Sequence, residues 1–69
     1  MAGFKVGDHV TWEWADDHIR GTVVRVLTKD TEFKGQTHRA RADDPQYEVK
    51  SDKTEQTAMH KGTALKHAG

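Results

Sequence analysis

Cysteine is absent from this chain of 69 residues, which excludes disulfides, thiol chemistry and cysteine-ligated zinc. No apolar run approaches the roughly 18 residues that a membrane-spanning helix needs. The first residues, MAGFKVGDHV, lack the apolar core of a signal peptide. A charge excess of either sign is also absent, because 11 basic residues balance 11 acidic ones. We therefore expect a cytoplasmic protein that makes no membrane contact and is not a strongly basic nucleic-acid module.

The short length limits the kind of function that fits. A chain of 69 residues allows one domain, which we expect over residues 1–69 with its core at about 4–66. Such a small domain rarely encloses the water-free pocket that catalysis needs. Ser51 is the only serine, and no catalytic motif surrounds it. We therefore expect no enzyme activity and no cofactor.

Two segments near the N-terminus have the alternation of strands. Apolar and polar residues alternate over 8–14, so Val10, Trp12 and Trp14 share one face. Residues 19–27 are rich in β-branched residues but break strict alternation, which predicts a bulge near Val23–Val24 and close strand approach at Gly21.

The remainder of the chain divides into a long connection and further short strands. Residues 28–45 hold little apolar material and form a long loop, with a short extra strand expected over 37–42. After the loop we expect strands at 46–51 and 56–60, joined by a tight turn at 52–55, then a turn at 61–63, a buried Leu65 and a frayed end at 66–69. No segment shows a helical period. The fold class is therefore all-β, a small barrel of about five strands.

Four stretches of the chain resemble a known family. They contain Gly7-Asp8-x-Val10-x-Trp12-x-Trp14, Gly21-Thr22-Val23, Pro45-x-Tyr47-x-Val49 and His60-Lys61. In this order, over about residues 4–66, they are similar to the hypervirulence-associated Tudor domain family. The resemblance implies an SH3-like, Tudor-type β-barrel with no enzyme activity. It also implies a glycine in the turn at 53–56, where this chain has Glu55, so the tightness of that turn is left open.

Aromatic residues are few, five in all, and they supply the first candidate site. Trp12 lies in mid-strand and is expected in the core. Trp14 lies at a strand end and is either packed or half exposed, while Phe33 is either a loop anchor or a contact residue. With Tyr47, which also fits the core, these two side chains are the candidate anchors for a protein or peptide partner at the barrel rim. An aromatic cage of Trp14, Phe33 and Tyr47 is the more specific form of this hypothesis.

Charge is unevenly distributed along the chain. Residues 18–41 carry six basic side chains against two acidic ones. Within this basic segment, Arg39 and Arg41 share one face if the chain is extended there. Together with Lys34 they are the candidates for an alternative function, weak and sequence-independent nucleic-acid binding that moderate salt would abolish.

The five histidines do not have the spacing of a metal motif. His60 is the one whose neighbours in a strand would orient it. The sequence thus predicts a monomeric binding module without a metal, whose partner is a protein or peptide.

Overall fold

The computed structural model describes residues 3–68, and its regular elements there are strands apart from one short 3₁₀ turn. In chain order the elements are β1 His9–Trp14, β2 Asp17–Leu27, β3 Thr31–Phe33, β4 Gln36–His38, β5 Gln46–Ser51, β6 Thr57–Lys61, a 3₁₀ turn η1 Gly62–Ala64 and β7 Lys66–His67. The all-β class is confirmed. Within residues 3–68 no helix has the length and apolar character to cross a membrane.

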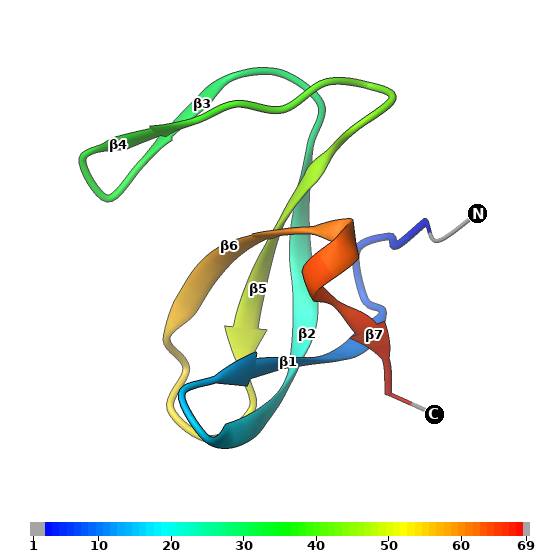
Figure 1. Ribbon diagram of the computed structural model, residues 1–69, viewed down its shortest axis with the longest axis vertical. Coiled ribbons are helices and arrows are strands. Elements are labelled where there is room, and N and C mark those ends of the chain that lie inside the picture. The colour runs from blue at the N-terminus through cyan, green and yellow to red at the C-terminus, as the bar shows by residue number, and fades with distance from the viewer. Residues whose placement is uncertain (1–2, 69) are drawn as a thin grey trace.

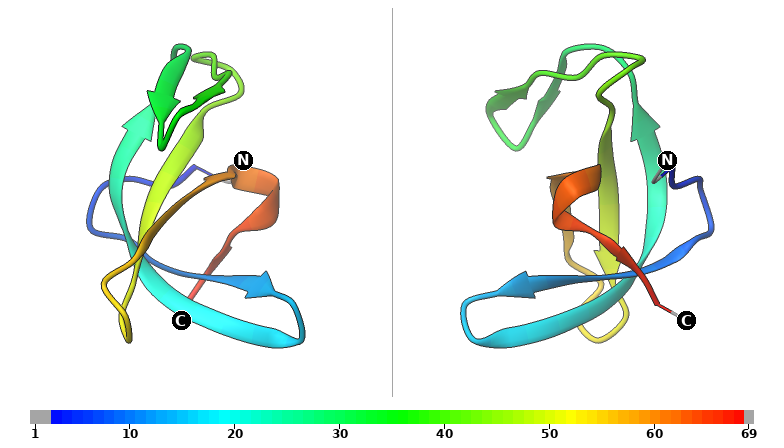
Figure 2. Two further views of the ribbon diagram at one scale, coloured as in Figure 1. Left: turned by 90° about the vertical axis from the view of Figure 1, so that its left-hand side faces the viewer. Right: turned by 45° about the vertical axis from the view of Figure 1, so that its right-hand side comes forward.

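The long strand β2 organises the fold, because it pairs with different partners along its length. Its first half pairs with β1 and its second half with β5, giving an antiparallel sheet in the order β6-β5-β2-β1-β7. The register shifts between Val23 and Arg25, which confirms the predicted bulge. The bend lets the two halves of the sheet face one another, as Figures 1 and 2 show. This arrangement is the SH3-like, Tudor-type fold.

The core lies between the two halves of the bent sheet. Val10, Val23 and Val49 are fully buried, one from each central strand. Around them pack further buried side chains, namely Phe4, Trp12, Tyr47 and Leu65. Each aliphatic side chain buried in this way contributes about 2 kcal/mol of transfer free energy. The predicted burial of Trp12, Tyr47 and Leu65 is confirmed, whereas Trp14, on the same face of β1 as Trp12, is exposed.

The segment 28–45 differs from the prediction of one short strand over 37–42. A hairpin of β3 and β4 forms instead, with Phe33 paired to Gln36. The two turn residues, Lys34 and Gly35, have positive φ angles of 51° and 78°. A two-residue turn with both φ angles positive has the twist that a hairpin favours, so it fixes the strands over 31–38 rather than 37–42.

Polar contacts close the base of this hairpin and tie it to β5. Buried Gln46 donates its side-chain amide to the Arg39 carbonyl at 2.7 Å. The Ala40 amide donates to Asp30 at 3.2 Å. Because Ala40 is itself buried, the chain is fixed where it returns from the hairpin to β5.

The prediction of a frayed end at 66–69 is wrong for its first residues. Lys66 and His67 form β7, which pairs with Thr11 and Val10 of β1. The ring of His67 also packs on Phe4, with ring centroids 4.4 Å apart. Backbone pairing and this ring contact order a segment whose composition gives no strand signal. Gly69 lies outside the described residues.

Candidate functional site

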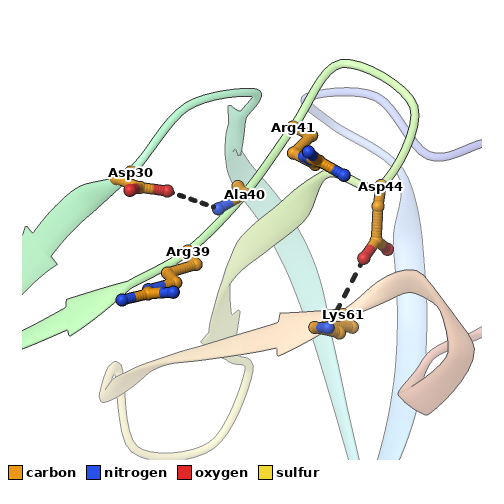
Figure 3. Close-up of a pocket in the computed structure, with 6 residues that line it drawn as sticks. All are labelled: Asp30, Arg39, Ala40, Arg41, Asp44 and Lys61. Carbon is orange, nitrogen blue, oxygen red and sulfur yellow. Dashed lines mark hydrogen bonds and ion pairs between the residues drawn. The ribbon is translucent and has the colours of Figure 1, made fainter.

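A concave surface with basic side chains lies where the returning hairpin chain meets the end of β6. Six residues line a depression of about 390 Å³, which we call the basic rim: Asp30, Arg39, Ala40, Arg41, Asp44 and Lys61. Figure 3 shows Arg39 and Arg41 on either side of Ala40 with their guanidinium groups pointing apart, while Lys61 of β6 faces Asp44. Three cationic side chains and two carboxylates thus line one depression, four of them from residues 30–44 and the fifth, Lys61, from β6.

Local backbone structure explains why both arginines reach this surface. Arg39 and Arg41 flank Ala40, which is buried, so an extended chain directs both of them outward. Arg41 and Asp44 also exchange two backbone hydrogen bonds of 3.1 Å, which close a tight turn. Both arginines therefore line the basic rim, with their guanidinium groups on opposite sides of Ala40.

Both carboxylates of the basic rim already have partners. Asp44 lies 3.4 Å from the Lys61 ammonium, and Asp30 accepts the Ala40 amide. The guanidinium groups of Arg39 and Arg41 take part in none of the ion pairs found among residues 3–68. Guanidinium groups with free donors bind carboxylates or phosphates in a bidentate manner. The basic rim is therefore suited to anionic groups.

Lys34 is separated from the two arginines with which it was grouped. Its ammonium donates to the Thr57 carbonyl at 3.0 Å and lies 5.3 Å from the centre of the Phe33 ring. It therefore sits at the start of β6, whereas the basic rim lies at the end of that strand. The three predicted nucleic-acid contacts, Lys34, Arg39 and Arg41, do not form one continuous stripe.

The aromatic candidates occupy three different places. Tyr47 is a core residue, 3% exposed, and packs edge-on against Phe4. Trp14 is 69% exposed at the β1–β2 turn, and half-buried Phe33 lies on the hairpin at the opposite end of the molecule in Figure 1. The cage of Trp14, Phe33 and Tyr47 is therefore not formed, because the three residues lie in different strands, β1, β3 and β5, and in different parts of the molecule. Trp12 packs in the core as expected.

His60 faces the interior, where its ring lies 5.6 Å from that of Trp12. Burial lowers the pKa of His60 below its ordinary value of 6.5, since the charged ring loses hydration there. Within residues 3–68 no three histidine or carboxylate side chains come together as a metal site would require.

Lys61, Asp30 and Asp44 were missed as site residues by the sequence reasoning. Lys61 reaches the basic rim only because β6 pairs beside β5, a long-range contact with no local sequence signal. Among the residues of the basic rim, only Arg39 and Arg41 show a pattern in the sequence, namely two arginines separated by one residue.

Comparison with known proteins supports the fold and its family. Residues 7–65 match the model of the hypervirulence associated proteins Tudor domain. Searches of curated proteins and of solved structures gave no match. The matched range runs from the glycine that precedes β1 to buried Leu65, and so includes all strands except β7. The chain therefore belongs to the hypervirulence-associated Tudor domain family.

Proposed function

We propose that this domain is a non-catalytic module that binds an acidic peptide segment of a partner protein through the basic rim. The observation that carries the proposal is the convergence of Arg39, Arg41 and Lys61 on one depression. Tudor domains in general are non-catalytic binding modules, which supports the broad class of function. The cations at the basic rim supply the chemistry that selects an acidic ligand.

The same geometry favours a peptide over a nucleic acid. Asp30 and Asp44 lie within the depression and would repel a continuous phosphate backbone. Phe33 is engaged by His38 and Lys34 on the hairpin, and Tyr47 is buried in the core, so neither ring offers a stacking face at the basic rim. A peptide can place separate carboxylates opposite separate guanidinium groups and avoid both acidic side chains.

A titration monitored by amide chemical shifts tests this proposal. The probe is an acetylated and amidated heptapeptide that alternates glutamate with valine, and a lysine–valine heptapeptide provides the opposite charge. We expect the acidic peptide to shift the amides of Arg39, Arg41 and Lys61, and the basic peptide to leave them unchanged. No shift at millimolar acidic peptide would contradict the proposal.

Charge reversal identifies the residues responsible. Arg41→Glu should weaken binding of the acidic peptide by at least about tenfold, because it replaces an attractive contact by a repulsive one. Arg20→Glu makes the same change of charge on the β1–β2 hairpin and is the matched control. Equal loss in both variants would indicate a nonspecific field effect instead of a site.

A short single-stranded DNA, titrated at low salt, decides the alternative function. The nucleic-acid hypothesis predicts shifts at Lys34, Arg39 and Arg41 that disappear as salt is added. Our proposal predicts that the DNA binds more weakly than the acidic peptide at the same salt concentration. The reverse order of affinities would replace the peptide by a nucleic acid as the ligand.

A further inference from the structure

Strand β6 forms one margin of the five-stranded sheet, and its backbone register shows which groups face outward. The Ser51 amide donates to the Gln56 carbonyl at 2.8 Å, and the pairing continues with Val49 opposite Ala58. Hydrogen-bonded residues alternate along an antiparallel pair, so Ala58 bonds to β5 while Thr57 and Met59 direct their backbone groups away from it. The bond from Lys34 to the Thr57 carbonyl agrees with this assignment.

The opposite margin of the sheet is different. Strand β7 has two residues, whereas β6 has five. A strand margin with free amides and carbonyls is a template for another extended chain, and longer margins offer more bonds. Among residues 3–68, β6 is therefore the margin best suited to accept an added strand.

Cationic groups stand at both ends of this margin. Lys34 reaches Thr57 at the start of β6, and the basic rim surrounds Lys61 at its end. The β3–β4 hairpin stands beside β6 in both Figures 1 and 2 but belongs to a separate two-stranded sheet. The outer margin of β6 thus has lysine and arginine side chains at both of its ends.

We infer that the acidic peptide binds as an added strand on β6, with its backbone paired to the outward amide and carbonyl of Met59. This inference rests on the proposed function and specifies its binding mode. Backbone pairing would supply affinity independent of sequence, while carboxylates on the peptide would reach Arg39, Arg41 and Lys61. Charge complementarity thus selects an acidic extended segment as the occupant, in preference to a second copy of this neutral chain.

Removing one backbone donor tests the inference. Met59→Pro deletes the outward amide, and proline is tolerated on a strand margin when its nitrogen faces away from the neighbouring strand. We expect Met59→Pro to weaken binding of the glutamate–valine peptide by about tenfold or more, since a backbone bond is lost and the added strand is obstructed. The control Met59→Ala keeps the amide and should change affinity by less than about threefold.

Hydrogen exchange in the unmodified domain gives a second measurement, which stands if Met59→Pro fails to fold. Saturating peptide should slow exchange of the Met59 amide by at least about tenfold. The Ala58 amide, already bonded to β5, should change much less. The two readouts are independent, because exchange requires no substitution.

The outcomes separate this inference from the proposed function. Peptide binding at the basic rim with unchanged Met59 exchange would overturn strand addition and leave the proposed function intact. Failure of the peptide to bind would overturn both. Protection of Met59 that rises with protein concentration in the absence of peptide would assign the β6 margin to self-association and overturn the inference.

Discussion

At Gly21 two strands approach too closely for any side chain. A β-carbon built there would overlap the Lys50 carbonyl oxygen and lie 2.6 Å from Cη2 of Trp12. Since the carbonyl belongs to the backbone of β5, relief requires the strands to separate. We predict that Gly21→Ala lowers the free energy of unfolding by at least about 2 kcal/mol, measured by urea denaturation.

Gly3→Ala is the control for this substitution. A β-carbon at Gly3 meets no atom within 4 Å, so we expect its midpoint of denaturation to match that of the unmodified chain. A Gly21→Ala variant as stable as Gly3→Ala would show that β2 and β5 lie further apart than described.

His60 makes stability depend on pH. Burial lowers its pKa in the folded state below 6.5, so the unfolded chain binds more protons as the pH falls through this range. The contribution of neutral His60 is therefore complete above about pH 7 and is lost as the pH falls below about 6.5. We predict that His60→Phe, which keeps a ring against Trp12, loses less stability than the unmodified chain between about pH 7.5 and pH 5.5.

Exposed His18 provides the comparison for that measurement. His18→Gln removes a histidine whose side chain lies at the surface, and it is the control for the loss of one histidine. If both variants flatten the dependence equally, the effect belongs to net charge and not to the burial of His60.

At the scale of the element, the turn between β5 and β6 contains a residue in a conformation that favours glycine. Glu55 has a φ of 60°, and its ion pair with Lys50 is long and exposed at 3.7 Å. Left-handed backbone costs a non-glycine residue about 1 kcal/mol, while an exposed ion pair contributes less. We predict that Glu55→Gly raises the free energy of unfolding by about 0.5 kcal/mol or more in thermal and urea unfolding.

The matched variant Lys53→Gly occupies the same turn without a positive φ, so it should lower stability through added freedom in the unfolded chain. A stabilising effect of Lys53→Gly would mean that the turn as a whole, and not Glu55 alone, is under strain.

The strands that the sequence predicted correctly are those with one buried face. Alternation marks β1 and β5, and the parity change within β2 revealed its bulge, because a pleated strand must hide every second side chain. The β3–β4 hairpin escaped prediction since its strands bury little, and a Lys34–Gly35 turn lacks the usual asparagine or aspartate. Strand β7 escaped as well, because its order comes from contacts with β1 and Phe4.

The candidate site was less predictable than the fold. Arg39 and Arg41 are separated by one residue, so parity alone predicted that both lie at one surface. Lys61 lies near the two arginines only because β6 pairs with β5. Lys34 lies away from them, at the start of β6, where its ammonium binds the Thr57 carbonyl. The aromatic character of Trp14, Phe33 and Tyr47 did not indicate where each side chain lies. Its location depends on which face of a strand the residue occupies and on how close it is to the end of that strand.

At the scale of the whole molecule, Asp8 connects the segment that precedes β1 to β7, close to the other end of the described chain. The Lys5 amide donates to its carboxylate at 3.0 Å, and this bond is the main reason that the pKa of Asp8 falls below 3.8. His67 of β7 lies 3.6 Å from the same carboxylate. A carboxyl group with a lowered pKa stabilises the fold above its ordinary pKa, and that contribution is lost as the pH falls below it.

We therefore predict that Asp8→Asn is less stable than the unmodified chain at neutral pH. The two free energies of unfolding should converge as the pH falls from about 5 to about 3, since Asp8 then becomes protonated. Asp16→Asn, which removes the same charge from the β1–β2 turn, is the control. A constant difference across this range would assign the effect to packing of the side chain.

The antiparallel pairing of β1 with β7 also has a mechanical consequence. The start of β1 lies beside the end of β7, where Ala68 donates to the His9 carbonyl at 2.9 Å. A force that pulls residues 3 and 68 apart therefore loads the hydrogen bonds of this pair one after another, like a zip, and not all together in shear. The domain should yield to a low stretching force in an optical trap, with β7 peeling from β1 before the core opens.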